Sequence, residues 1–411
     1  MLGTTFIKLK PDLTKSLCLN EAMQPLPIVR VNRKAADRIH SGHVWIFTSD
    51  VVDANSAQPG DAVRVIDHKG GALGVAHYSS TSQISLRLLT CQIEDIDEGF
   101  LRKRIEAALA LRHRLVAGSD AYRLVHAEGD LLPGLIIDRY ADWLVLQLLD
   151  QGMDKISGDI VAALESVLHP SGIVARNDVA VRAKENLPQE VRVLAGVVPK
   201  HVLIHMNGLT CQADLLTGQK TGVFLDQREN YLAARRYAKG RALDCFTATG
   251  GFALHLASVC ESVEAVDSSA AALTAARANA EANNLTNIVF HQADVLDYLP
   301  GLVAARRTFD IVIVDPPAFT KSRGALEGAA RGYKEINLRA LRLLSSGGTL
   351  VTCSCSHHMT EAHLLEIIAS AALDCGKQLR VLERRTQSQD HPILLTVPET
   401  HYLKCLIFEV L

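Results

Sequence analysis

The chain of 411 residues predicts a multidomain α/β protein: an N-terminal β-barrel, a central α+β domain and a C-terminal domain built on a mostly parallel sheet. Its length exceeds what one ordinary hydrophobic core organises. Strand-like and helical segments alternate after residue 240, which is typical of a parallel sheet with helices on both faces. Short apolar alternations separated by turns fill most of the first 100 residues and favour a barrel there.

The N-terminal part divides into an extension and the barrel. Residues 1–27 resemble a terminal extension and lack the long apolar stretch of a secretory signal. Residues 28–100 are expected to form the barrel, with strands at 62–66 and 84–88 where apolar residues alternate with others.

Residues 101–205 are expected to hold a linking helix and the central α+β domain. The helix, predicted over 99–116, has an apolar side and a basic side that carries Arg102, Arg104 and Arg112. Arg102 and Arg104 are candidate RNA contacts, and the alternative is a solvated helix face. Strands are expected at 134–139, 143–149 and 172–176, with an amphipathic helix near 153–168.

Residues 206–411 are predicted to form a β-hairpin followed by the doubly wound domain. Buried strands are expected at 243–246, 263–266, 288–290, 311–314 and 349–353, with helices near 252–260, 269–283, 327–344 and 360–375. Two final runs near 379–384 and 402–410 predict an antiparallel edge.

Composition limits the class of protein. Apolar residues make up 48% of the chain and charged residues 21%, a normal globular balance, and no apolar run is long enough for a membrane span. Nine cysteines without framework spacing favour reduced thiols and a cytoplasmic location. The net charge of −2 does not itself point to a nucleic-acid partner.

The strongest local pattern is an aspartate near the end of each of four successive strands. These are Asp244, Asp267, Asp294 and Asp315, and the turn Asp244-Cys-Phe-Thr-Ala-Thr-Gly-Gly251 follows the first strand. Carboxyl ends of parallel strands meet at one sheet edge, where ligands bind and an acid accepts bonds from ribose. The turn lacks the GxGxxG spacing of dinucleotide folds, which remain the main alternative. The pattern therefore favours an adenosyl cofactor, S-adenosylmethionine (SAM).

The residues expected to contact this cofactor come from the strand ends and the segment before the first strand. They are Asp244, Phe246, Thr249, Gly250, Gly251, Asp267, Ser268, Asp294, Val295 and Asp315, with Gln227 and Arg228 from the segment 221–228.

Six motifs together resemble one family, the bacterial large-subunit ribosomal RNA cytosine-5 methyltransferases with a PUA domain. They are Gly42-His-Val-Trp-Ile-Phe47, Glu128-Gly-Asp-Leu-Leu-Pro-Gly-Leu135, Thr221-Gly-Val-Phe-Leu-Asp-Gln-Arg228, Asp315-Pro-Pro-Ala-Phe319, Arg331-Gly-Tyr-Lys-Glu-Ile-Asn337 and Thr352-Cys-Ser-Cys-Ser356. The matches run from about residue 28 to the C-terminus in the family's order.

The resemblance implies a PUA-like RNA-binding domain, a Rossmann-like class I methyltransferase domain and a homodimer. It also implies 23S rRNA, free or in a large-subunit assembly intermediate, as substrate, and 5-methylcytosine as product. Two positions depart from the family: Ala248 replaces a usual aromatic residue, and His357 a common glycine. Both departures concern the lining of the expected pocket.

Cytosine C5 is a poor nucleophile, so its methylation requires a reactive cysteine that adds to C6. Cys355 follows the fifth strand and matches the family's Ser-Cys-Ser cysteine, whereas Cys353 is expected to face the core. Asp315 is the second catalytic candidate, as a hydrogen-bond partner of the base. A metal site at Cys353, Cys355 and His357-His358 is disfavoured, because no partner pair of ligands exists.

Other functions stay open at this point. Asp315-Pro-Pro also resembles amino-group methyltransferases, so an exocyclic amine, or a guanine, is the alternative target. A ribosome-assembly protein that binds RNA without catalysis is the alternative from another class. Lys321, Arg323, Arg331 and Lys334 follow Asp315 and are candidate phosphate contacts, or else they are parts of a solvated loop and helix.

Overall fold

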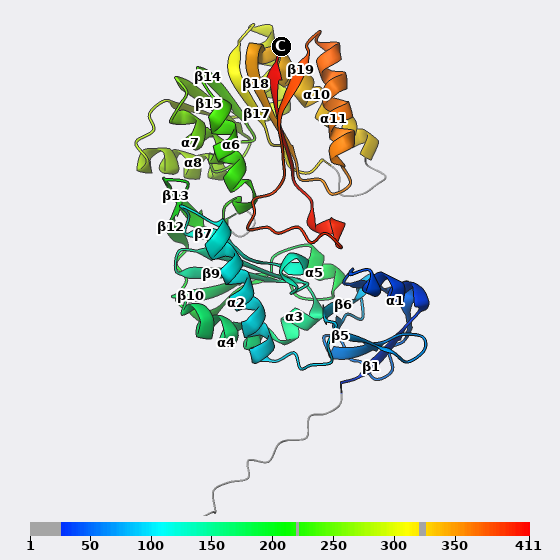
Figure 1. Ribbon diagram of the computed structural model, residues 1–411. Helices are drawn as coiled ribbons and strands as arrows, with labels where there is room; N and C mark the ends of the chain where they lie inside the picture. Colours follow the sequence, from blue (N-terminus) through cyan, green and yellow to red (C-terminus); the bar gives the residue numbers. More distant parts are fainter. Residues whose placement is uncertain (1–25, 219–221, 320–325) are drawn as a thin grey trace, which may run out of the picture.

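The computed structural model describes residues 26–218, 222–319 and 326–411. Figure 1 shows the C-terminal domain above the central domain, with the N-terminal barrel to one side of the latter. Within the described residues, no helix combines the length and the apolar character that crossing a membrane requires.

The N-terminal barrel is a six-stranded sheet in the order β2-β6-β5-β4-β1-β3. Its strands are β1 (Ile28–Val31), β2 (Trp45–Phe47), β3 (Val51–Asp53), β4 (Ala62–Ile66), β5 (Ala72–Tyr78) and β6 (Ile84–Thr90), with helix α1 (Arg33–His40) after β1. Alternate residues such as Val29, Ile46, Val63 and Leu86 are fully buried, which explains the period-2 pattern of the sequence.

The central domain is a five-stranded sheet in the order β11-β10-β9-β8-β7. It contains β7 (Ala121–His126), β8 (Leu135–Tyr140), β9 (Trp143–Leu148), β10 (Gly172–Arg176) and β11 (Val191–Gly196), with helices α2 (Glu98–Leu115), α3 (Gln151–Lys155), α4 (Ser157–Leu168) and α5 (Val181–Lys184). Leu101 and Ile105 of α2 and Ile160 of α4 belong to its buried core. A buried ion pair joins the barrel to this domain. Arg87 of β6 pairs with Glu185, which follows α5, at 2.9 Å.

A hairpin of β12 (His201–Met206) and β13 (Leu209–Asp214) leads into the C-terminal domain. It packs on a helix of that domain, because the backbone amides of Thr210 and Gln212 donate to the side-chain oxygens of Asn283 and Asn279, each at 2.8 Å. The hairpin therefore fixes the segment that enters the functional edge of the sheet.

The C-terminal domain is a seven-stranded sheet in the order β16-β15-β14-β17-β18-β20-β19. Its strands are β14 (Arg241–Cys245), β15 (Ser262–Asp267), β16 (Ile288–Gln292), β17 (Phe309–Val314), β18 (Leu344–Ser354), β19 (Leu379–Arg385) and β20 (Lys404–Val410). All pairs from β16 to β18 are parallel. β20 runs antiparallel between β18 and β19, so the last two strands form the predicted antiparallel edge, with β19 outermost.

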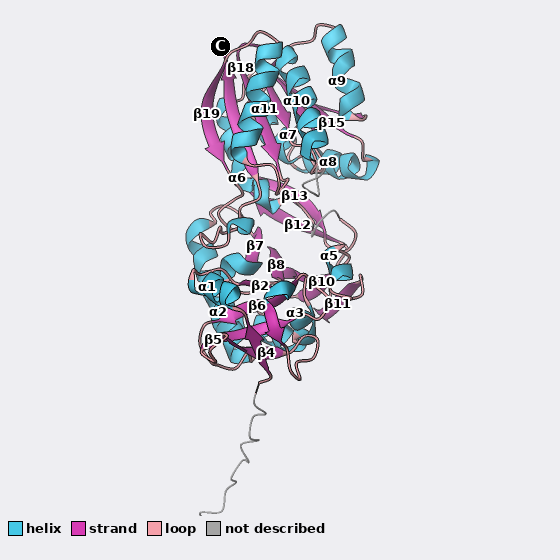
Figure 2. Ribbon diagram, turned by 90° about the vertical axis from the view of Figure 1, so that its right-hand side faces the viewer, coloured by secondary structure: helices cyan, strands magenta, loops and turns pink. Residues whose placement is uncertain are grey.

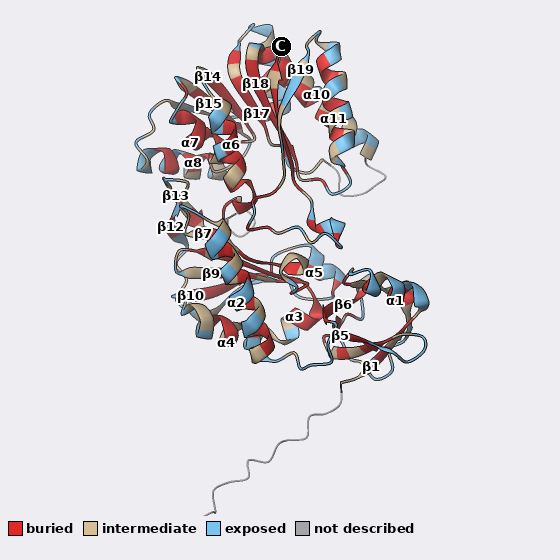
Figure 3. Ribbon diagram, in the orientation of Figure 1, coloured by how far each residue is buried: buried red, intermediate tan, exposed pale blue. Residues whose placement is uncertain are grey.

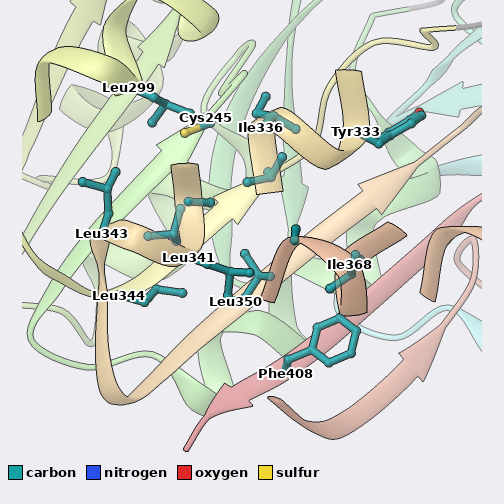
Figure 4. Packing of buried hydrophobic residues seen from close by; sticks show 14 of the residues in the cluster. Cys245, Leu299, Tyr333, Ile336, Leu341, Leu343, Leu344, Leu350, Ile368 and Phe408 are labelled. Carbon is teal, nitrogen blue, oxygen red and sulfur yellow. The ribbon is translucent and has the colours of Figure 1, made fainter. Parts of the chain in front are cut away.

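Six helices cover the two faces of this sheet, as Figure 2 shows from the side. They are α6 (Arg228–Tyr237), α7 (Gly251–Ala257), α8 (Ala270–Ala282), α9 (Val295–Ala304), α10 (Leu326–Leu343) and α11 (Glu361–Asp374). Figure 3 shows the central strands β14, β17 and β18 largely buried, and one of the two cores, with Leu341, Leu350 and Phe408, is drawn in Figure 4. A strand buried on both faces appears in sequence as a continuous apolar run, as predicted for these strands. The expectation of a buried strand at 288–290 was wrong, because β16 lies at the edge of the sheet and none of its residues is buried.

The segment between β19 and β20, residues 386–403, leaves the sheet and reaches the central domain (Figure 1). There the amide of Arg123 donates to Asp390 at 2.9 Å, and the Arg112 guanidinium donates to the Asp390 carbonyl at 2.7 Å. Arg112 also pairs with Asp130. The expectation that Arg112 lies on an exposed basic face was wrong, because its side chain is fully buried in this junction.

Candidate active site

A loop with unusual backbone geometry follows β14 and opens the functional edge of the sheet. Phe246, Ala248 and Gly250 all have positive φ, at 64°, 48° and 91°, a conformation that non-glycine residues rarely adopt. Beneath the loop, the buried Asp244 carboxylate accepts bonds from Thr247 Oγ1 at 2.6 Å and from the Ala253 amide at 2.9 Å. Burial raises the pKa of Asp244 to about 7. Asp244 thus holds the loop from below.

The loop forms one wall of a cavity of about 270 Å³ at the carboxyl edge of the strands, here called the edge cavity. Its lining residues are Phe224, Asp226, Gln227, Tyr231, Phe246, Thr247, Ala248, Thr249, Gly251, Phe252, Asp267, Ser268, Ser269, Asp315, Pro316, Pro317, Cys355 and Leu403. A glycine is required at Gly251, because a Cβ there would lie 2.4 Å from the Tyr231 ring. The helix can therefore begin close beneath whatever the cavity holds.

Asp267 presents its carboxylate to the edge cavity from the end of β15. Its Oδ2 accepts a bond from the Ala248 amide at 2.9 Å and its Oδ1 from the Ser269 amide at 2.8 Å. An ionised carboxylate has about four acceptor positions, so the two oxygens retain capacity for a ligand diol. This donor set fits the ribose of an adenosyl cofactor.

Asp315 lies directly after β17 and is oriented by a glutamine. Gln227 Nε2 donates to Asp315 Oδ2 at 2.9 Å, while Gln227 Oε1 accepts from Asn230 at 2.7 Å. The two bonds fix which end of the amide faces Asp315. Pro316 and Pro317 continue the cavity wall.

Cys355 lines the edge cavity at the turn after β18, and it is partly exposed. The Tyr333 hydroxyl hydrogen-bonds the Ser354 and Ser356 hydroxyls at 2.8 and 3.2 Å and so clamps the turn on both sides of the sulfur. Cys353 is fully buried beside its strand partner Cys405, and burial raises its pKa well above the ordinary value. The prediction that Cys353 faces the core is confirmed.

Five predicted cofactor residues do not line the edge cavity, and one of them is Asp244, which lies beneath the loop. Gly250 supplies the turn, Val295 is buried, and Asp294 accepts from the Leu296 amide at 2.8 Å as the cap of α9. The prediction for Arg228 was wrong, because its buried guanidinium pairs with Asp390 at 3.4 Å and Glu229 at 3.3 Å instead.

Several lining residues were not among the predicted site residues, and Asp226, Tyr231 and Leu403 are three of them. Asp226 and Tyr231 lie in the segment that leads into α6 and in α6 itself, which the sequence did not reveal as a helix. Leu403 arrives at the end of the 386–403 segment, about 90 residues of sequence beyond Asp315. The motif at 221–228 was the one sequence signal that pointed to this wall of the edge cavity.

The predicted RNA contacts that the structure describes lie on two helices. On α2, Arg102 is exposed near Glu106 at 3.9 Å, and Arg104 lies over the Phe100 ring. On α10, Arg331 is exposed and Lys334 pairs with Asp374 at 2.8 Å. Lys321 and Arg323 fall outside the described residues.

A second, larger cavity of about 890 Å³ lies between the barrel, the central domain and the 386–403 segment; it is called the interdomain cleft. Its lining residues are Trp45, Ile84, Arg87, His126, Ala127, Glu128, Gly134, Ile136, Leu149, Val181, His357, His358, Pro398, Glu399, Thr400, His401 and Tyr402. Tyr402 lines the cleft while its neighbour Leu403 lines the edge cavity. No group of three or more potential metal ligands occurs among the residues that the structure describes.

The strand order and the edge cavity define a class I methyltransferase, whose methyl donor is SAM. A methyltransferase-domain model matches residues 238–394, and a PUA-like-domain model matches residues 29–91. The chain belongs to the ribosomal RNA large subunit methyltransferase I family. Family members from Shewanella denitrificans and Photobacterium profundum are 41% and 43% identical over 90% and 88% of this chain, and 95% and 94% of theirs.

Solved structures share the fold. A SAM-dependent methyltransferase from Streptococcus mutans has a TM-score of 0.79 at 22% identity, over 93% of this chain and 99% of that chain. The structure of SMU.776, a methyltransferase complexed with SAH, reaches a TM-score of 0.81 with the same identity and coverage. At this identity the likeness concerns the fold alone, and it confirms the predicted α/β class.

Replacing Asp267 with alanine should weaken SAM binding about tenfold or more, because charge-assisted hydrogen bonds contribute about 1.5–3 kcal/mol. Isothermal titration with SAM measures the effect, and thermal melting checks the fold. Asp297→Ala, which removes an exposed acid on α9, is the matched control and should bind normally. An unchanged affinity in Asp267→Ala would remove Asp267 from the cofactor site.

Proposed function

We propose that this enzyme forms 5-methylcytosine in 23S rRNA, with Cys355 as the nucleophile that activates the base. The observation that carries the proposal is that Cys355, Asp267 and Asp315 line one cavity. A thiol is thereby placed beside both the expected ribose anchor and an acid able to bind the base.

The proposed reaction runs through a covalent bond between enzyme and base. The Cys355 thiolate attacks C6 of the cytosine, and the electron pair of the C5–C6 double bond becomes available at C5. SAM supplies an electrophilic methyl group, which C5 takes up. A base then removes the C5 proton, the C5–C6 double bond reforms, and the thiolate leaves.

Asp315 is proposed to bind the cytosine ring or its amino group. Gln227 donates to one oxygen of this carboxylate, and Asp315 lines the edge cavity together with Cys355. Methylation of an exocyclic amine, or of a guanine, uses the same Asp-Pro-Pro segment without Cys355 and is the alternative. The position of Cys355 in the cavity wall favours the C5 reaction.

Ribosomal RNA as substrate is supported by the relatives, which are named ribosomal RNA large subunit methyltransferases, and by the PUA-like barrel at 28–100. We propose that the RNA strand, in free rRNA or in an assembly intermediate, occupies the interdomain cleft. A base flipped out of this RNA strand would pass Tyr402 and enter the edge cavity. Aromatic and histidine rings on the cleft wall, such as Trp45 and His357, suit stacking with unpaired bases.

Arg331 is the strongest of the proposed phosphate contacts among the residues of α10, because it is exposed two residues from Tyr333, which bonds the Cys355 turn, whereas Lys334 already pairs with Asp374. Arg331→Ala should weaken rRNA binding and reduce its logarithmic salt slope by roughly 0.7–0.9, with SAM affinity unchanged. Filter binding at several salt concentrations tests this. Arg342→Ala, at the far end of α10 and also exposed, is the control; equal salt slopes in all three proteins would exclude Arg331.

The proposed function as a whole is tested by mass spectrometry of rRNA from cells with and without the gene. Loss of 5-methylcytosine at one 23S rRNA position is the expected result. Loss of a methylated amine or guanine would favour the alternative target, and unchanged rRNA would favour the non-catalytic RNA-binding protein.

A cytoplasmic location is supported by the cysteines, which form no disulfide among the described residues. A homodimer is supported by the family resemblance and by apolar side chains exposed on β11 and β12, such as Val193 and Leu203. Light scattering of the purified protein measures the oligomeric state.

A further inference from the structure

A buried lysine lies behind the turn that carries Cys355. Lys404 begins β20 directly opposite Ser354, the last residue of β18, and its side chain is almost fully buried. Its Nζ donates to the carbonyl oxygens of Ser356 and Tyr402, each at 2.8 Å. The ammonium group therefore joins the turn after Cys355 to the segment that separates the edge cavity from the interdomain cleft.

The charge of Lys404 interacts with Cys355. Burial lowers the pKa of Lys404 to about 8, while the charges of Cys355 and Glu361 act in the opposite direction and favour the ammonium form. Glu361 already pairs with Arg384. Because the interaction between two titratable groups is mutual, an ammonium at Lys404 favours the thiolate at Cys355 as much as the thiolate favours the ammonium.

We propose that Lys404 is a positioning residue that ties the Cys355 turn, at the Ser356 carbonyl, to the 386–403 segment, at the Tyr402 carbonyl, and stabilises the Cys355 thiolate by its positive charge. The use of that thiolate in catalysis rests on the proposed function, but the stabilisation itself does not. Lys404 does not line the edge cavity, so it does not touch the base. When the thiol ionises, its proton passes to solvent and no bond to Lys404 forms.

Lys404 is one of several charged or titratable groups around this turn. The others are Tyr333 from α10, Asp315 after β17, His357 in the turn itself and Glu361 from α11. Lys404 differs from the others because its ammonium is held by two main-chain carbonyls, that of Ser356 just after Cys355 and that of Tyr402 in the 386–403 segment. These two bonds keep the charge next to the Cys355 turn.

The test is the rate at which iodoacetamide alkylates Cys355 between pH 6 and 10, in the full-length protein without RNA. Peptide mass spectrometry gives the rate at each cysteine, and the exposed Cys91 is an internal reference. Lys404→Met should raise the apparent pKa of the Cys355 thiol by roughly one unit or more, so that alkylation at pH 7 slows about tenfold. Lys404→Arg should stay near the wild-type profile, and Cys91 should not change.

Lys404→Gln separates the effect of charge from that of hydrogen bonding, because glutamine keeps a donor for the carbonyls but carries no charge. The same variant replaces Lys404→Met if the Met variant fails to fold. It should show the same shift, with SAM binding retained. A wild-type profile in the folded Gln variant, or an equal shift in Lys404→Arg, would overturn the proposal. Neither outcome depends on RNA. The C5 reaction could therefore fail its own test while the alkylation rates still support Lys404, and the alkylation test could fail while the C5 reaction is confirmed.

Discussion

Cys355→Ala should abolish rRNA methylation, with kcat at least about a thousandfold lower, because residues that form covalent intermediates give losses of this size or larger. SAM binding should be retained, since the expected ribose anchor Asp267 is fixed by the amides of Ala248 and Ser269 and not by the Cys355 turn. Tritium transfer from labelled SAM to rRNA measures turnover, and calorimetry measures SAM affinity.

Cys353→Ala is the matched control two residues away. Cys353 lies in the core between β18 and β20, so its loss should cost about 1 kcal/mol of packing and leave methylation within a few fold of wild type. Near-normal methylation by Cys355→Ala would exclude the covalent route and leave the amine or guanine as the target.

Arg112→Met should lower the free energy of unfolding by about 3–5 kcal/mol, the second large effect expected here. Arg112 is fully buried and pairs with Asp130, which is itself 4% exposed at its side chain. Removing one partner of a buried pair leaves the other charge uncompensated in the interior. The same substitution frees the Asp390 carbonyl and so loosens the 386–403 segment. Urea unfolding followed by circular dichroism measures the loss.

Arg114→Met is the control on the same helix, because Arg114 is exposed and two residues further along α2. It should change stability by less than about 0.5 kcal/mol. Equal stability of the two variants would show that the Arg112 junction contributes no more than a solvated arginine.

Local patterns were sufficient to predict the frame of the site. The strands that end at Asp267 and before Asp315 are buried on both faces, so they appear as apolar runs, and their carboxyl ends meet at one edge by the geometry of parallel sheets. Cys353 and Cys355 were distinguished by their place along the chain, because Cys353 lies within β18 whereas Cys355 follows the end of that strand at the ligand edge.

The errors concern residues whose partners are distant in the sequence. Arg112 was expected on the basic side of a helix and Arg228 at the cofactor, but the 386–403 segment brings Asp390 to both of them. Asp244 has the spacing of a ligand contact, yet its carboxylate bonds Thr247 and Ala253 below the loop. Local periodicity carries no information on such contacts, which depend on how the domains dock.

The central claim is the covalent bond between Cys355 and the target cytosine. An rRNA fragment that contains 5-fluorocytosine at the methylation site, incubated with enzyme and SAM, tests it most directly. After methyl transfer the fluorine cannot leave as a proton does, so the account predicts a denaturation-resistant protein–RNA complex, with the crosslinked peptide mapping to Cys355 and no complex from Cys355→Ala. Methylation of the unmodified fragment without any trapped complex from its fluorinated counterpart would contradict the account.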